Sequence, residues 1–166
     1  NTSAMQAKYI FDYFNADATT LHPYMGLDSL EPFFKYQDKF NFVLGLTSNP
    51  GSKDFEELPL KNNTTLASTV IQTLSHWNKT YQNIGVVVGA TDNKLTEARN
   101  INPDLLFLIP GVGKQGGTYE TAYNAGKNLA DLALINVSRG ISGAVKHKQS
   151  IKEDINHAIQ VILKPL

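Results

Sequence analysis

The two arginines of the chain have different sequence surroundings, and one of them is placed to bind an anion. Arg139 follows the apolar run 132–137 and lies between Ser138 and Gly140. A planar guanidinium beside a glycine can form two parallel hydrogen bonds to a phosphate. The alternative for Arg139 is an exposed arginine without a partner. Arg99 lies in a predicted helix, and we interpret it as a solvated surface residue.

A glycine-rich loop precedes this segment and offers a second anion-binding element. Residues 111–117 read G-V-G-K-Q-G-G, which matches the pattern G-x-G-x-x-G. A dinucleotide site would need an acidic residue about 20 positions further on, but residues 136–138 are Asn, Val and Ser, so that interpretation fails. Glycines still let backbone N–H groups approach an anion at the start of a helix. Gln115 adds an amide donor, so Gln115 and Arg139 together predict a phosphorylated ligand; a tight structural turn is the alternative.

Other polar residues near strand ends carry weaker signals. Ser48 can hydrogen-bond a ligand or the backbone of its own Ser-Asn-Pro-Gly turn, and spacing alone favours the turn. His22 occupies a similar position, where a lone histidine is more often structural. The other three histidines lack metal-ligand spacing, and no pair of carboxylates is arranged for acid–base catalysis. The sequence therefore predicts no metal site.

Five short apolar runs precede these residues, and we predict each run to be a β-strand. The runs are nearly all apolar rather than alternating, which is typical of parallel strands buried on both faces. Capping residues and apolar spacing predict helices between them. The predicted strands are 16–21, 42–46, 84–88, 105–109 and 132–137.

Helical segments are predicted before the first strand and after every strand. Residues 52–63 are polar and are predicted to form a long loop. The predicted helices run from 2 or 3 to 14, from 28 or 29 toward 40, from 64 or 65 to 81, and from starts at 92, 118 and 150. The last of them carries an apolar stripe of Ile151, Ile155, Ala158, Ile159 and Ile162.

This order of one helix followed by five β/α units fits two architectures. An open doubly wound sheet binds its ligand at one switch point, whereas all strands of a (β/α)8 TIM barrel end at the same mouth. All five strand exits carry polar, Gly or Pro residues, which favours the barrel, and the last two loops of such barrels commonly bind phosphate. Because a barrel has about 250 residues, we expect residues 1–166 to be the C-terminal part of one barrel domain. Its N-terminal strands would be absent from this chain.

Composition narrows the possible partners. The chain has 166 residues, of which 42% are hydrophobic and 18% charged, and its formal net charge is zero. No basic stripe indicates nucleic-acid binding, and no polybasic run or long apolar run indicates a membrane. Cysteine is absent, which excludes disulfides and fits a reducing, cytoplasmic setting.

Five motifs at the strand exits, in chain order, resemble orotidine 5′-monophosphate decarboxylase, most closely its longer bacterial form. They are HPYMGLDS (22–29), LTSNPG (46–51), VVGAT (87–91), PGVGKQGG (110–117) and NVSRG (136–140). The resemblance implies a TIM barrel that acts as a homodimer in the last step of de novo UMP synthesis. Members of the family remove carbon dioxide from orotidine monophosphate without a metal or an organic cofactor. They stabilise a carbanion that develops at the pyrimidine ring, and a lysine protonates it.

The resemblance also implies how the phosphate is bound. Gln115 and Arg139 would hold it, with help from the backbone near Ser138. The family usually has alanine at the position of Lys114, so no role is implied for that lysine, which we expect to point into water.

Further roles are implied for the remainder of the nucleotide. Ser48 would hydrogen-bond the pyrimidine base, and Thr2 would reach the ribose of the ligand bound to the partner subunit. The residues expected to line the apolar side of the pocket are Leu44, Val88 and Pro110.

The catalytic aspartate–lysine–aspartate array of the family has no counterpart in this sequence, because the resemblance places it just before Asn1. We therefore predict that residues 1–166 alone do not decarboxylate, and that the two unpaired edges of a five-stranded sheet promote aggregation. One alternative is a different phosphate-binding barrel, such as a sugar-phosphate decarboxylase. Another is a nucleotide- or flavin-binding open sheet without catalysis.

Overall fold

Five parallel strands form one sheet, and their spatial order follows the chain. A computed structural model describes residues 2–61, 63–90, 92–112, 118–146 and 150–163. The sheet has the order β1-β2-β3-β4-β5 with parallel pairing throughout. A doubly wound sheet reverses its order at a switch point, so the open-sheet alternative is wrong and the arrangement is that of part of a TIM barrel. The strands are β1 (Ala18–Leu21), β2 (Phe40–Leu46), β3 (Ile84–Val88), β4 (Phe107–Pro110) and β5 (Leu134–Asn136).

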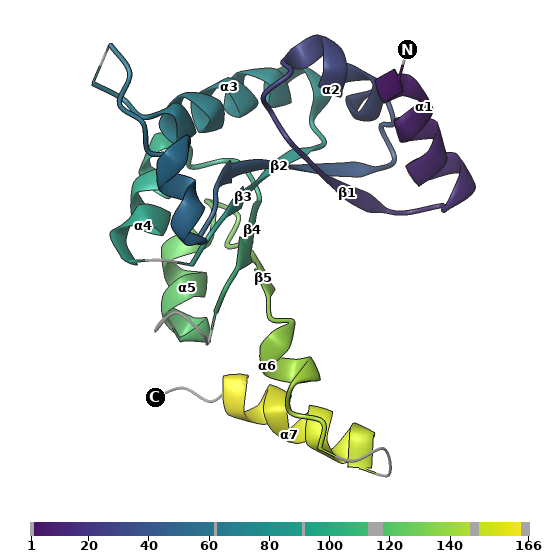
Figure 1. Cartoon of the computed structure of the whole chain (residues 1–166), viewed down its shortest axis with the longest axis vertical. Coiled ribbons are helices and arrows are strands. Elements are labelled where there is room, and N and C mark those ends of the chain that lie inside the picture. Colours follow the sequence, from purple (N-terminus) through teal and green to yellow (C-terminus); the bar gives the residue numbers. More distant parts are fainter. Residues whose placement is uncertain (1, 62, 91, 113–117, 147–149, 164–166) are drawn as a thin grey trace.

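Helices cover the outer side of the curved sheet. Figure 1 shows α2 to α5 along that side, with α1 near the N-terminus and α6 and α7 beyond β5. Short turns of other helical types extend α1 (η1, Tyr9–Tyr13) and follow β2 (η2, Pro50–Asp54). The α-helices are α1 (Thr2–Lys8), α2 (Leu27–Phe34), α3 (Leu66–Tyr81), α4 (Asp92–Ile101), α5 (Tyr119–Gly126), α6 (Arg139–Ser142) and α7 (Ile151–Leu163).

Threonine caps begin two of the helices, as predicted. The Thr65 hydroxyl accepts a hydrogen bond from the Ser68 amide at 3.1 Å, and the Thr118 hydroxyl accepts one from the Thr121 amide at 3.1 Å. Each cap pairs an amide that has no partner inside its helix.

Residues 52–63 are not entirely a loop, because the 3-10 turn η2 covers their first part.

The end of α2 differs from the prediction, which extended this helix toward Phe40. The buried side-chain amide of Asn83 donates to the backbone carbonyls of Phe34, Tyr36 and Lys39 at 3.1, 2.9 and 3.1 Å. These bonds satisfy carbonyls just beyond the helix and hold the chain in a turn. Phe40 then starts β2, where its amide donates to the Asp17 carbonyl at 3.0 Å.

The start of β4 also differs, because the strand begins at Phe107 rather than at Leu105. The side-chain oxygen of Asn102 accepts from the amides of Asp104 and Leu105, both at 3.0 Å. This Asx turn uses the Leu105 amide that a longer strand would need.

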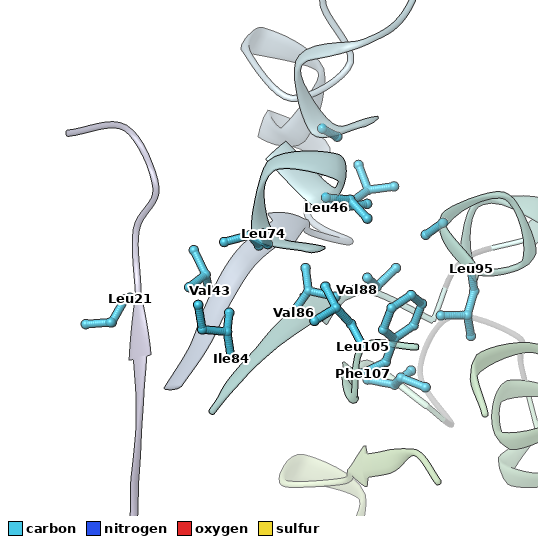
Figure 2. Close-up of a cluster of buried hydrophobic side chains, with 14 of the residues drawn as sticks. Leu21, Val43, Leu46, Leu74, Ile84, Val86, Val88, Leu95, Leu105 and Phe107 are labelled. Atoms are coloured by element: carbon cyan, nitrogen blue, oxygen red, sulfur yellow. The ribbon is translucent and has the colours of Figure 1, made fainter. Parts of the chain in front are cut away.

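Strand side chains that face the helices form the core, as Figure 2 shows. Val43, Val86 and Phe107 are 0% exposed. Leu44 and Leu108, which alternate with them, are only partly buried. Alternate strand residues point to opposite faces, and no helix of the described residues covers the inner face. Burial on both faces was therefore predicted correctly for β3 but wrongly for β1 and β5, the two edge strands.

Arg99 is a structural residue, so its interpretation as a solvated surface side chain is wrong. Its guanidinium donates to the carbonyls of Asn102 and Leu105 at 3.0 and 2.8 Å, and to the Gly126 carbonyl at 3.2 Å from Nε. The same group lies 3.5 Å from the centre of the Phe107 ring. Burial lowers the pKa of Arg99 to about 10, so the side chain stays charged at neutral pH.

Helix α7 follows the prediction with one exception. It packs against α5 and α6. Ala158 is buried, and Ile155, Ile159 and Ile162 are half-buried, whereas Ile151 is 46% exposed. A membrane-spanning segment is not found among the described helices, which are too short or too polar for that role.

Candidate functional site

The carboxyl ends of β2, β3, β4 and β5 are joined by a continuous row of backbone contacts. The Gly89 amide donates to the Leu46 carbonyl at 2.8 Å, and the Ala90 amide donates to the Pro110 carbonyl at 3.0 Å. Pro110 in turn pairs with Asn136 of β5. All polar residues predicted to follow these strands therefore emerge at one edge of the sheet, as in a barrel mouth.

Ser48 lies near one end of this row, two residues beyond β2. A Cβ atom on Gly89 would lie 2.6 Å from Cβ of Ser48 and 2.8 Å from its backbone nitrogen. Only glycine allows the end of β3 to approach the Ser48 turn so closely. The fold therefore places the half-buried Ser48 at the mouth, by direct packing against the neighbouring strand.

Ser138 and Arg139 lie at the other end of the row. The Ser138 hydroxyl donates to the side-chain oxygen of Asn136 at 3.0 Å. Arg139 is the first residue of α6 and is exposed. Among the described residues, no carboxylate forms an ion pair with Arg139. Its guanidinium can therefore accept an anionic ligand without losing an internal partner.

The loop after β4 begins beside the loop that carries Arg139. Gly111 has φ of 98°, a left-handed conformation that favours glycine, so the chain turns sharply after Pro110. Pro110 and Asn136 are paired neighbours, and adjacent strands lie about 4.8 Å apart. Gln115 and Lys114 lie outside the described residues.

The three residues expected to line an apolar wall do not all face the same side. Leu44 and Pro110 are partly exposed, and Leu44 alternates with the helix-facing Val43. Val88 is 0% exposed and belongs to the cluster between the sheet and the helices (Figure 2). Its side chain therefore does not line the inner face, which differs from the expectation. An apolar run alone does not tell which residues of a fully buried strand face inward.

Thr2 is separated from the row within one chain. It is the exposed first residue of α1, and α1 packs against α2. Figure 1 shows α1 and α6 at opposite ends of the molecule. The structure therefore does not bring Thr2 and Arg139 together in a single subunit.

Two adjacent carboxylates organise the segment that follows Ser48, and neither was singled out from the sequence. Glu56 accepts hydrogen bonds from the amide and the hydroxyl of Thr47 at 2.6 and 2.9 Å. Glu57 lies 2.6 Å from the Lys94 ammonium and accepts from the Ser52 hydroxyl at 3.1 Å. Hydrogen bonding to Lys94 holds the pKa of the Glu57 carboxyl below its usual value, and Ser52 lowers it further. Contacts across an irregular segment have no periodicity that a sequence pattern could reveal.

A pocket of about 270 Å³ opens near the ends of β1 and β2. Its lining includes Leu44, Thr47 and Glu56, together with His22 from the loop after β1. The described residues contain no group of three or more His, Cys, Asp or Glu side chains that could hold a metal ion. The polar groups of the described residues at this mouth thus include hydroxyls, amides, the His22 imidazole, the Glu56 carboxylate and the exposed guanidinium of Arg139.

Comparison with known proteins identifies close relatives. A family model described as orotidine 5′-phosphate decarboxylase / HUMPS family matches residues 1–153. The orotidine 5′-phosphate decarboxylase of Dehalococcoides mccartyi is 44% identical across 95% of this chain, which covers 63% of that protein. The enzyme of the same name from Flavobacterium johnsoniae is 40% identical across 97% of this chain, which covers 59% of it. The chain thus spans about three-fifths of these relatives.

Solved structures of related proteins resemble this chain in both fold and sequence. The OMP decarboxylase of Leishmania donovani has a TM-score of 0.79 and 36% identity, with coverage of 99% of this chain and 64% of that chain. The UMP synthase of the same organism has a TM-score of 0.80 and 40% identity, with coverage of 96% of this chain and 36% of that chain. Both likenesses extend over nearly all of the sheet and helices described above.

Proposed function

The chain belongs to the orotidine 5′-phosphate decarboxylase / HUMPS family, and from this premise we propose that the protein converts orotidine monophosphate to UMP and carbon dioxide. The reaction replaces the carboxylate on the pyrimidine ring with a proton and would serve pyrimidine nucleotide synthesis. We also propose a cytoplasmic location, because charged phosphate monoesters remain in the compartment where they are made.

The row of strand ends would bind the nucleotide along its length. Ser48 hydrogen-bonds the pyrimidine base, while Leu44 and Pro110 contact its apolar face. Arg139 and Gln115 bind the phosphate at the other end. A phosphate held in this way positions the reacting ring and supplies binding energy distant from the bond that breaks.

The chemical step needs charged groups at the reacting carbon itself. In the resemblance, an aspartate–lysine–aspartate array precedes residue 1, and its lysine protonates the carbanion that remains after carbon dioxide leaves. Residues 1–166 by themselves are therefore proposed to supply the nucleotide-binding part of the site but not the turnover.

One observation carries the proposal above all others. The five strand-exit motifs occur in family order, and the sheet brings those of β2 and β5, with Ser48 and Arg139, to the same edge. The test is to express residues 1–166 with all coding sequence that flanks them in the gene, and to measure release of labelled carbon dioxide from orotidine monophosphate. We expect turnover with the flanking sequence and none with residues 1–166 alone.

The same assay separates this proposal from the other phosphate-binding barrels. Turnover of a sugar phosphate, with no turnover of orotidine monophosphate, would assign the chain to a different reaction within its family. Turnover of orotidine monophosphate by residues 1–166 alone would contradict the proposed division between binding and catalysis.

Replacing Gly89 with alanine is expected to weaken UMP binding by about tenfold, the effect of one lost hydrogen bond. The added methyl group would collide with the backbone of Ser48, because its Cβ atom would lie 2.8 Å from the Ser48 nitrogen. The Ser48 turn must then move away from the base. Isothermal titration calorimetry with UMP measures the loss, and a thermal melt checks that the variant is folded.

Gly51→Ala is the matched control, because it makes the same substitution within the loop that carries Ser48. Its Cβ atom would meet only the ends of side chains, those of Asn49 at 3.2 Å and of Asp54 at 3.7 Å. Equal losses in both variants would show that general loosening of the loop, rather than displacement of Ser48, causes the effect.

We propose that the protein is a homodimer in which the outer face of α1 meets a second copy. Thr2, Met5, Tyr9 and Tyr13 line one side of the helical segment at helical spacing. Met5 and Tyr13 are 65% and 74% exposed. Thr2 lies at the end of this apolar stripe, so a partner that covers the stripe would contact Thr2, as its proposed role at the ribose of the partner's ligand requires.

Tyr13→Asp is expected to convert the dimer to a monomer, because a charge in an apolar interface loses its hydration without gaining a partner. Light scattering coupled to size-exclusion chromatography measures the mass in solution. Leu129→Asp is the control, since Leu129 is 83% exposed and lies in the loop after α5. A monomeric wild-type protein, or a dimer that survives Tyr13→Asp, would contradict this interface.

A further inference from the structure

The turn that presents Ser48 is held by a carboxylate nine residues further along the chain. Glu56 Oε2 accepts from the Thr47 amide at 2.6 Å, and Glu56 Oε1 accepts from the Thr47 hydroxyl at 2.9 Å, which shares its single proton with the side-chain oxygen of Asn49 at 2.6 Å. Two bonds from one rigid carboxylate to one residue fix both the position and the orientation of that residue. Hydrogen bonds to a charged acceptor are roughly twice as strong as neutral ones.

Glu56 is itself firmly anchored. Its amide donates to the Ser52 carbonyl at 2.8 Å, and its carbonyl accepts from the Ala67 amide at 2.8 Å. Ala67 lies in the first turn of α3 and is buried in the core between the helices and the sheet. The carboxylate is therefore connected through its own backbone to the rigid outer layer of the fold.

The neighbouring carboxylate has a different role. Glu57 forms an ion pair with Lys94 of α4 and accepts a hydrogen bond from the Ser52 hydroxyl. The ion pair connects the segment to α4. Among the described residues, no lysine or arginine forms an ion pair with Glu56. The half-buried charge of Glu56 is thus used for Thr47 and not for a surface ion pair.

Ser48 is consequently constrained from two directions. Glu56 fixes Thr47, the residue directly before it, and Gly89 packs against Ser48 from the next strand. The geometry points to Glu56 as a positioning residue for base recognition: its carboxylate holds Thr47 and thereby sets where Ser48 meets the pyrimidine. This inference rests on the proposed function, in which Ser48 hydrogen-bonds the base.

Glu56→Ala and Glu56→Gln test the inference in the protein expressed with all its flanking coding sequence. Alanine removes both bonds to Thr47. Glutamine keeps them, because its oxygen accepts from the Thr47 amide and its NH2 group donates to the Thr47 hydroxyl, whose proton then goes to Asn49, 2.6 Å away. Affinities are measured by calorimetry for UMP and for ribose 5-phosphate, which has the phosphate but lacks the base.

We expect Glu56→Ala to weaken UMP binding by about tenfold, which corresponds to one hydrogen bond to the base. Its affinity for ribose 5-phosphate should remain within about twofold, because phosphate binding does not involve the Thr47 turn. Glu56→Gln should recover UMP binding to within about threefold of the wild-type protein, since a neutral acceptor is weaker than a charged one. Should Glu56→Ala not fold, Thr47→Val removes the hydroxyl bond alone and is expected to weaken UMP binding by about threefold.

Glu57→Ala is the matched control, with the same loss of charge at the adjacent position. It should lower the melting temperature without changing the ratio of the two affinities. An equal loss for UMP and ribose 5-phosphate in Glu56→Ala, failure of glutamine to restore binding, or the same selectivity change in Glu57→Ala would each overturn the role of Glu56. A wild-type protein that binds UMP no more tightly than ribose 5-phosphate would instead overturn the proposed base recognition, and the role of Glu56 with it.

Discussion

Replacing Arg139 with alanine is expected to weaken UMP binding by about 100-fold, because a guanidinium can form two charge-assisted hydrogen bonds to a phosphate. Arg139 is exposed at the start of α6. Because Pro110 of β4 pairs with Asn136 of β5, the loops that follow these two strands begin side by side. Uridine, which lacks the phosphate, should bind the variant and the wild-type protein equally. The measurement is the ratio of UMP to uridine affinity by calorimetry at one fixed ionic strength.

Arg139→Lys separates geometry from charge. Lysine keeps the positive charge but lacks the planar pair of donors, so we expect it to recover only part of the affinity for UMP. Lys152→Ala is the control for net charge, because Lys152 is an exposed cation on the neighbouring α7. Parallel losses for UMP and uridine in Arg139→Ala would show that Arg139 supports the fold or the base rather than the phosphate.

Replacing Arg99 with methionine is expected to lower the free energy of unfolding by about 3 kcal/mol, because it leaves buried carbonyl groups without donors. Arg99 joins the end of α4 to the end of α5 through the carbonyls of Asn102, Leu105 and Gly126. Methionine keeps the contact with the Phe107 ring but supplies no hydrogen bond. For a protein of this size the melting temperature should fall by roughly 6–12 °C.

Lys127→Met is the control for this experiment, because it removes a cation at the same end of α5. Lys127 forms an exposed i,i+4 ion pair with Asp131 at 2.7 Å. Such pairs contribute at most about 1 kcal/mol, so its melting temperature should change little. If both variants melt at the wild-type temperature, Arg99 is not the structural link that its contacts indicate.

The regular elements could be predicted where their signals are local. Strand β3 was predicted at 84–88 and is observed as Ile84–Val88, and α3 was predicted to 81 and ends at Tyr81. Apolar runs and threonine caps determine such boundaries without help from distant residues. The end of α2 was mispredicted because the side-chain amide of Asn83, which lies far along the chain, binds the carbonyls of Phe34, Tyr36 and Lys39.

Sequence patterns indicated residues for the proposed site, but not the contacts that hold those residues in place. The motifs after the strands indicated Ser48 and Arg139, since parallel strands bring their carboxyl ends to one edge. Glu56 gave no signal, because its bonds to Thr47 arise from an irregular segment folded back on the strand end. Val88 was assigned to the wrong face, because a strand that is apolar throughout does not distinguish its two sides.

The sequence by itself determined the succession of helices and strands, the preference for a barrel over an open doubly wound sheet, and the family that the strand-exit motifs resemble. Only the tertiary structure showed that Arg99 is a structural residue rather than a solvated one. Both lie at helical positions in the chain, yet Arg99 is enclosed by α5 and β4 whereas Arg139 is exposed. The physical reason is that the free energy of a charged group depends on which carbonyls, rings and water surround it, and those neighbours come from other elements of the fold.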